Sequence, residues 1–238
     1  MKVNISVLAW GSTAWVDEFA RGTLMTVAVA VCSFPVGILL GSVFAAAKLC
    51  PFSLLRFLAD VYTTVVRGIP ELLIIFLVFF GGDTLLRYVA NAVFGFEGYI
   101  ELPVFAVGVL CIGISAGAYA TEVIRAAVIA IPTGQIEAAV AMGLERTVLL
   151  RRILIPQAAR FALPGLGNVW QLALKDTSLI SVVGLVEIMR TAAIGAGSFK
   201  EPFTFYLVAF VIFLLLSSIS NQGFLRAEKW ANRGVRRR

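Results

Sequence analysis

Polar and ionisable side chains interrupt the long apolar stretches of this sequence, where their types suit them to bind a small polar solute. The richest group lies between Phe161 and Val183 and consists of Asn168, Gln171, Lys175, Asp176, Thr177 and Ser178. Asn168 and Gln171 are three residues apart and therefore lie on one face of a helix. An amide side chain both donates and accepts hydrogen bonds, so this pair is suited to the α-amino and α-carboxylate groups of an amino acid.

We predict a substrate cavity from these side chains and from a charged pair further upstream. Its candidate residues are Asn168, Val169, Gln171, Arg67, Glu71 and Ser178. Arg67 and Glu71 are four residues apart, so they are expected to pair on one helix, and Arg67 is alternatively a ligand for a substrate carboxylate. Gly165 and Gly167 predict a locally open or bent helix whose backbone groups are free to bind a ligand. The alternative for this group is close packing and hydrogen bonding between helices.

Two further charge pairs are interpreted as structural. Lys175 and Asp176 are adjacent and project about 100° apart on a helix, so each is expected to pair elsewhere, in a salt bridge or across a subunit interface. Glu122 and Arg125 are three residues apart near the end of another apolar stretch. We interpret them as gate or scaffold charges rather than ligand groups.

The sequence does not indicate a catalytic or metal-binding arrangement. It contains no histidine, which excludes Ser-His-Asp and Cys-His catalysis and histidine metal sites. The three cysteines are far apart and form no CxxC pair. No G-x-x-x-x-G-K-[ST] motif occurs, so any nucleotide hydrolysis is expected in another polypeptide. We therefore expect no enzyme activity, and no metal or cofactor bound by this chain.

The composition indicates a membrane protein. Hydrophobic residues make up 60% and charged residues 14% of the 238 residues, against about 45–50% and about 25% in soluble chains. Mean hydropathy is +0.93, and too little polar surface remains to cover a soluble core of this size. The net charge of +6 does not indicate nucleic-acid binding, because the basic residues crowd the loops and the C-terminal tail.

Five apolar stretches are long enough for membrane-spanning helices, which need about 20 residues. They run approximately from Gly22 to Ala47, from Phe57 to Gly81, from Pro103 to Ala130, from Phe161 to Val183 and from Pro202 to Gly223. The predicted fold is therefore all-α, a polytopic membrane protein with five transmembrane helices, and no cleaved signal peptide is indicated.

Basic residues set the predicted orientation, because Lys and Arg are enriched in cytoplasmic loops. Twelve of them lie on one set of alternate loops and five on the other. The N-terminus is thus expected outside and the C-terminus inside. The predicted organisation is an extracytoplasmic segment 1–21, a transmembrane domain 22–223 that contains a cytoplasmic loop 131–160, and a basic cytoplasmic tail 224–238.

The 131–160 loop has helical features of its own. A turn signal opens it, and Thr133 or Gly134 is expected to cap the helix that follows. Charged and apolar residues then alternate as in a pair of short amphipathic helices that pivot near Gly143. Pro156 is expected to end this helical pattern.

The same loop resembles a motif of importer-type ABC permeases, EAA-x3-G-x9-I-x-L-P. The matching residues are Glu137, Ala138, Ala139, Gly143, Ile153 and Pro156, with Ile155 in place of leucine. The resemblance implies that residues 131–160 form a coupling loop on which a separate ATPase docks. Glu137 is suited to pair with a basic residue of that ATPase, which would fix register more than add affinity. The alternative is an interfacial amphipathic loop without a partner.

Further motifs are similar to the polar amino-acid uptake branch of these permeases, and most of all to the Q-type subunits of histidine, lysine/arginine/ornithine and opine systems. They include Thr23-Leu24, Arg67-Gly68-Ile69-Pro70, Ala118-Tyr119, Gly134-Gln135 and residues 163–168 and 174–179. The resemblance implies a second, M-type permease subunit in a heterodimer, two ATPase subunits that bind ATP-Mg, and a periplasmic binding protein at the bacterial inner membrane.

One position departs from the pattern of relatives that bind cationic amino acids. The residue after their Gly-Asn pair is often acidic, whereas here it is Val169. Either the M-type partner therefore holds the charge-selecting residue, or the substrate is not simply cationic.

The resemblance and the topology together predict the membrane subunit of an ATP-driven importer for a polar, basic amino acid or opine, which works by alternating access. The alternative is an ion-gradient-driven secondary transporter of small polar solutes. The odd number of spans, the lack of a detectable inverted repeat and the coupling loop argue against it. A membrane-embedded enzyme is disfavoured because the sequence has neither histidine nor an H-E-x-x-H motif.

Overall fold

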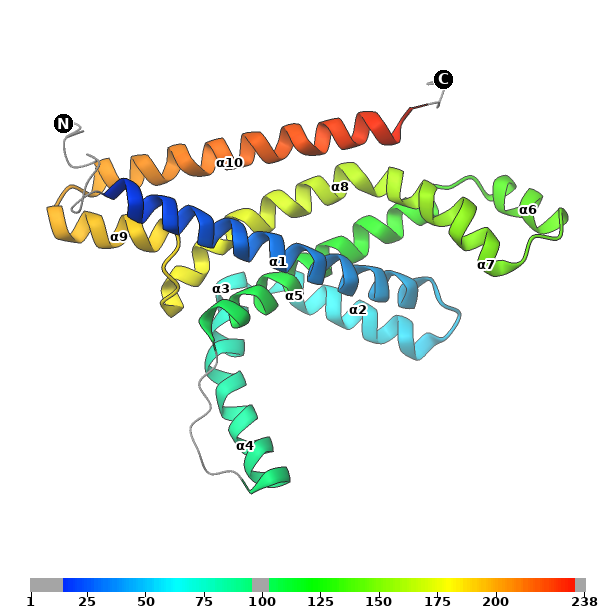
Figure 1. Ribbon diagram of the computed structural model, residues 1–238. Helices are drawn as coiled ribbons and strands as arrows, with labels where there is room; N and C mark the ends of the chain where they lie inside the picture. The colour runs from blue at the N-terminus through cyan, green and yellow to red at the C-terminus, as the bar shows by residue number, and fades with distance from the viewer. Residues whose placement is uncertain (1–14, 96–102, 234–238) are drawn as a thin grey trace.

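Helices account for all the regular structure in residues 15–95 and 103–233, the part of the chain that the computed structural model describes. Four long helices run side by side and form a bundle (Figure 1). They are α1 (Trp15–Leu49), α5 (Val104–Ile129), α8 (Ile155–Asp176) and α10 (Pro202–Ala231). The shorter α2 (Ser53–Gly68) packs on α1 and α5, and α9 (Ile188–Phe199) packs on α1 and α10. The predicted all-α fold is confirmed.

Glycine and alanine bring α1 and α5 into direct contact. A Cβ atom added to Gly37 would lie 2.8 Å from the Cβ of Ala116, and one added to Gly41 would lie 2.6 Å from the Cβ of Ala120. A larger residue does not fit at either position, and small residues are what allow membrane helices to pack this closely. α1 and α5 therefore form a tightly packed pair through the middle of the bundle.

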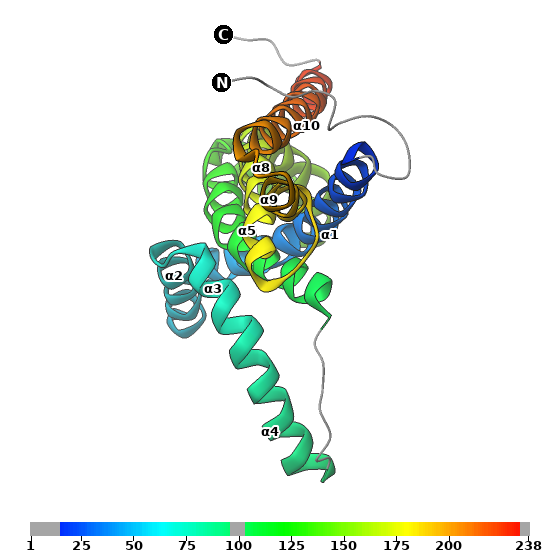
Figure 2. The ribbon, with the colours of Figure 1, turned by 90° about the vertical axis from the view of Figure 1, so that its left-hand side faces the viewer.

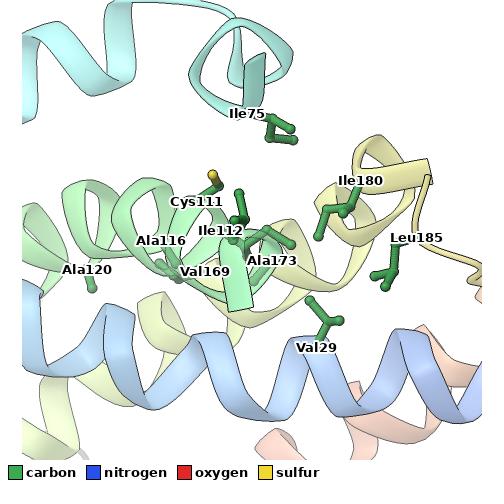
Figure 3. Close-up of a cluster of buried hydrophobic side chains, with 11 residues drawn as sticks. Val29, Ile75, Cys111, Ile112, Ala116, Ala120, Val169, Ala173, Ile180 and Leu185 are labelled. Atoms are coloured by element: carbon green, nitrogen blue, oxygen red, sulfur yellow. The ribbon is translucent and has the colours of Figure 1, made fainter. Parts of the chain in front are cut away.

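Two apolar clusters hold the remaining helices on this pair. In the larger one, Val29 of α1 lies with Ile112 of α5 and Ala173 of α8 (Figure 3). The smaller one joins α1, α9 and α10, where the rings of Trp15 and Phe205 meet edge to face with centroids 5.1 Å apart. The buried side chains thus follow α1 along much of its length.

The number of membrane spans lies between three and five. α1, α5 and α10 are each long and apolar enough to cross a membrane. Two bent helix pairs raise the number to five if each pair is one span. They are α2 with the helical segment Glu71–Leu85, bent by 108°, and the run Arg146–Val183 with α9, bent by 49°. The predicted five spans are reached only in that case.

The second predicted span is broken at Pro70. Ile69 before it is extended, with φ −107° and ψ 151°, which is the conformation that a following proline favours. The chain then leads away from the bundle as an arm (Figure 2). The arm is α4 (Gly82–Phe94), which is joined to α2 by α3 (Glu71–Phe76), packed on α5, and by a π-helical turn (Leu77–Gly81).

Candidate functional site

The segment predicted to be a coupling loop forms two short helices that project beyond one end of the bundle (Figure 1). They are α6 (Thr133–Ala141) and α7 (Arg146–Leu149). Gly143 between them has a φ of +73°, a conformation that glycine adopts at least cost. The N–H of Gly143 donates to Val140 at 2.9 Å and that of Leu144 donates to Ala139 at 3.1 Å, which closes the end of α6. The two predicted helices are therefore present, with the turn at Gly143.

The outer surface of α6 is both charged and apolar. Glu137 and Ala138 are exposed, whereas Ala139 on the opposite side is buried. The side chains of Val140 and Met142 are 61% and 72% exposed. Exposed apolar side chains beside a carboxylate are a surface that a partner protein can cover.

Pro156 does not end the helical pattern, contrary to the prediction. α7 passes through a π-helical turn, Leu150–Leu154, directly into α8, and Pro156 lies in the first turn of α8. Proline is tolerated near the start of a helical segment, where its missing N–H would not form a regular intrahelical bond. Thr133 does not cap α6 either, because it is the first residue of that helix and follows Pro132, which makes no side-chain cap.

The residues predicted to form one substrate cavity are divided among several places. On α8, Asn168 is exposed, but Val169 is only 3% exposed and lies in the apolar core. Gln171 donates from Nε2 to the carbonyl oxygen of Ser217 on α10 at 3.0 Å. Ser178 lines a separate cavity against α10.

The predicted opening of the helix at Gly165 and Gly167 is wrong, because α8 is continuous through both residues. A Cβ atom added to Gly165 would lie 2.6 Å from Cγ1 of Val123 on α5, and one added to Gly167 would lie 3.3 Å from the ring of Phe224 on α10. Both glycines therefore serve close packing between helices, which was the alternative.

Arg67 and Glu71 do not pair on one helix, because the break at Pro70 separates α2 from α3. The guanidinium of Arg67 instead lies over the ring of Tyr119 on α5, with its Cζ 5.3 Å from the ring centroid. Glu71 instead lies beside Asp176 of α8 in a small crevice against α5. The two members of the predicted pair thus face different parts of the bundle.

A polar cavity that the sequence did not indicate lies between α1, α2 and α5. Its volume is about 390 Å³, which is within the range of cavities that bind small molecules. The residues that line it are Lys48, Thr63, Thr64, Arg67, Gly68, Tyr119 and Glu122. Of the six residues predicted for the substrate cavity, only Arg67 belongs to this lining.

Ion pairs and hydrogen bonds fix Lys48 in the wall of this polar cavity. Its Nζ is 2.9 Å from Oδ1 of Asp60 and 2.7 Å from Oγ1 of Thr63, and it also pairs with Glu122 of α5. Glu122 in turn pairs with Arg125 at 3.0 Å, which agrees with the interpretation of these two residues as scaffold charges. Lys48 is not among the residues predicted for the site, because no spacing rule links residues so far apart in the chain.

A helical membrane bundle with an open polar cavity on one side and a projecting, motif-bearing loop is the arrangement expected of a permease. Within the described ranges, no group of three or more His, Cys, Asp or Glu residues is placed to hold a metal ion. Residues 9–227 match the model of the family described as the binding-protein-dependent transport system inner membrane component. The chain belongs to this family.

Curated relatives and solved structures agree with this assignment. The nopaline transport system permease protein NocQ of Agrobacterium fabrum is 73% identical over 98% of this chain and 99% of its own length. The histidine/lysine/arginine/ornithine permease protein HisQ of Escherichia coli is 37% identical over 91% of this chain and 94% of its own length. A crystal structure of an amino acid ABC transporter with histidines superposes with a TM-score of 0.80, at 27% identity, over 96% of this chain and 99% of that one.

The chain is therefore a membrane permease component of ABC importers and is not itself an enzyme. The Q-type resemblance of the sequence is confirmed by these relatives. The alternative of an ion-gradient-driven transporter is not favoured.

Proposed function

We propose that this permease moves a polar, basic amino acid or an opine across the bacterial inner membrane. The 73% identity to a nopaline permease over nearly the whole of both chains carries this proposal. Relatives named for octopine and for histidine, lysine, arginine and ornithine are 46% and 37% identical. The substrates in these names share an amino-acid carboxylate, which supports a solute that carries the same group.

The proposed complex contains two ATPase subunits with their ATP-Mg, a second permease subunit of the M type in a heterodimer, and a periplasmic binding protein. The exposed edge of α6, with Glu137, Val140 and Met142, supports ATPase docking on the coupling loop. The twelve-to-five distribution of basic residues supports a cytoplasmic coupling loop, an outer N-terminus and a cytoplasmic C-terminus.

The connections of α6 and α7 to the bundle support the proposal that the ATPase moves the transmembrane helices. α5 ends at Ile129, shortly before α6 begins, and α7 continues into α8 through the π-helical turn. Nε2 of Gln157 at the start of α8 donates to Oε1 of Gln135 on α6 at 2.7 Å. A displacement of α6 is therefore passed to α5 and α8 together, and rocking of these helices would alternate access to the cavity.

Arg67 is the residue that we propose to bind the substrate carboxylate. Its guanidinium is held over Tyr119 in the wall of the polar cavity, and it has no carboxylate partner within the described residues. Arginine presents paired N–H donors that match a carboxylate. Asn168, Glu71 and Ser178 are proposed as further contacts along the path. Val169 and Gln171 pack against protein, which supports a charge-selecting residue in the M-type partner.

Reconstitution of the complete transporter in proteoliposomes tests the proposal. The purified permease pair, the ATPase and the binding protein would be supplied with radiolabelled nopaline, octopine, arginine and histidine. We expect ATP-dependent uptake of at least one of them and stimulation of ATPase activity by the loaded binding protein. Uptake that follows an imposed ion gradient without ATP would overturn the proposal.

A further inference from the structure

α2 is attached to the rest of the bundle differently from the other helices. Of its residues only Ala59 and Thr63 are buried. Its links to α1 and α5 include the bonds of Lys48, the hydrogen bond from the Tyr62 hydroxyl to the carbonyl oxygen of Ile114 at 2.7 Å, the stacking of Tyr62 on Phe44, and the contact of Arg67 with the ring of Tyr119. A few directional bonds therefore hold α2, and Lys48 makes two of them.

These contacts occupy all the N–H donors of the Lys48 ammonium group. It has three N–H donors, and it meets three oxygen atoms, from Asp60 and Thr63 on α2 and from Glu122 on α5. The side chain is 8% exposed. A buried cation is stable only while its partners stay in place, so a movement of α5 must be followed by Lys48 and by α2.

The position of this contact links the coupling loop to the cavity. Glu122 lies on α5 less than two turns before that helix ends and leads into α6. Thr63 lies one turn before Arg67 on α2, and both line the polar cavity. Beyond Arg67 the chain bends at Pro70 into α3, so α2 ends beside the cavity.

We propose that Lys48 is a positioning residue that transmits the movement of the coupling loop to α2 and so keeps Arg67 in place beside α5 while the bundle moves. When α5 shifts with α6, Glu122 carries the ammonium group of Lys48, and Asp60 and Thr63 draw α2 along. Arg67 on α2 therefore moves together with Tyr119 on α5, and the cation–π contact between them is kept during the movement. This inference rests on the proposed function, because it needs an ATPase that displaces the loop.

The test is the coupling ratio, the amount of solute transported per ATP hydrolysed, in the reconstituted transporter. Lys48→Met keeps an unbranched side chain of nearly the same length and removes its charge, and we expect the ratio to fall about tenfold. Lys48→Arg keeps the cation and several donors and is expected to restore most of the ratio. A merely structural role would lower uptake and hydrolysis in proportion, because fewer complexes would be active, and would leave the ratio unchanged.

Arg56→Met is the matched control. Arg56 lies in the first turns of α2, is exposed, and donates only to the carbonyl oxygen of Cys50 at 3.1 Å within the described residues, so its loss should not change the ratio. An unchanged ratio in Lys48→Met, or an equal fall in Arg56→Met, overturns the proposal. If Lys48→Met does not assemble, Thr63→Val decides, because a wild-type ratio in that variant also overturns it. A wild-type complex without ATP-dependent uptake would instead refute the proposed function.

Discussion

Helix α5 meets its two neighbours in opposite ways. Towards α1 it presents Ala116 and Ala120, which touch the glycine positions of α1 so closely that no other residue fits. Towards α2 it presents Tyr119, which lies under Arg67 of α2, and Glu122, which pairs with Lys48 at the end of α1, and both line a cavity. Close packing has a single arrangement, whereas directional bonds can be exchanged for others. The comparison indicates a rigid pair, α1 and α5, to which α2 is attached by a few directional bonds.

A leucine at Gly41 would break the packed side and should have the largest effect. The added Cβ would lie 2.6 Å from the Cβ of Ala120 and 3.1 Å from its backbone carbon, so the helices must separate, at a cost of about 1–3 kcal/mol or more. We expect little assembled protein and a clearly lower Tm in detergent. Gly223→Leu is the control, since nothing lies within 4 Å of its Cβ. Equal stability of the Gly41→Leu and Gly223→Leu variants would contradict the close packing of α1 against α5.

Arg67→Ala acts on the polar side and should change transport without unfolding the bundle. We expect KM for uptake to rise about tenfold, because a charge-assisted hydrogen bond to the substrate carboxylate is lost. The Tm should hardly change, since the guanidinium contributes only a stacking contact worth roughly 0.5–1 kcal/mol. Arg56→Ala at the other end of α2 serves as the control. A large fall in Tm with KM unchanged would mean that α2 is a packed helix like α1.

Gly143→Ala tests whether the packed pair of α1 and α5 responds to a change in the coupling loop. Alanine at a φ of +73° costs about 1–2 kcal/mol, so α6 and α7 should change their mutual angle while the bundle stays folded. We expect stimulation of the ATPase by loaded binding protein to fall roughly fivefold, a coupling change of typical size. Gly134→Ala lies in the same loop, in a helical conformation with open space around it, and should behave as wild type. Full stimulation in Gly143→Ala would show that this turn does not set the position of α6.

Tyr62→Phe should have the smallest effect, and it tests how strongly a single hydrogen bond holds α2. It removes the 2.7 Å hydrogen bond to Ile114 but keeps the ring stacked on Phe44 at 4.1 Å. Such bonds in membrane proteins average about 0.6 kcal/mol, so the Tm should fall only slightly. Tyr206→Phe on α10 is a control with an exposed ring. A loss as large as that of Gly41→Leu would show that α2 is held rigidly.

Local signals predicted much of the fold. Apolar length predicted both ends of α5 and one end each of α1 and α10, whereas α1 begins earlier, at Trp15, and α10 continues to Ala231, because charged residues can extend a helix beyond its apolar stretch. The loop motif placed two short helices around Gly143, where a positive φ explains the glycine. These features depend on residues close together in the chain, which is why they could be predicted from a single sequence.

The site was harder to predict because its contacts join distant residues. Arg67 and Glu71 have helical spacing, but Pro70 ends the helix between them. Gly165 and Gly167 looked like helix-opening residues, whereas their neighbours Val123 and Phe224 come from other helices. The sequence contains no signal that brings Lys48 to Glu122.

The π-helical turn at Leu150–Leu154 has a consequence for the helical phase of everything that follows it. A π-helical turn takes up about one residue more than an α-helical turn, which rotates the downstream side chains by about 100° around the axis. A helical wheel drawn without interruption from Arg146 would therefore assign Asn168 and Gln171 to the wrong sector. The angular relation between the coupling loop and the residues of α8 is set by this one wide turn. A deletion that restored a regular α-helix there would rotate every side chain of α8 around the helix axis relative to the coupling loop.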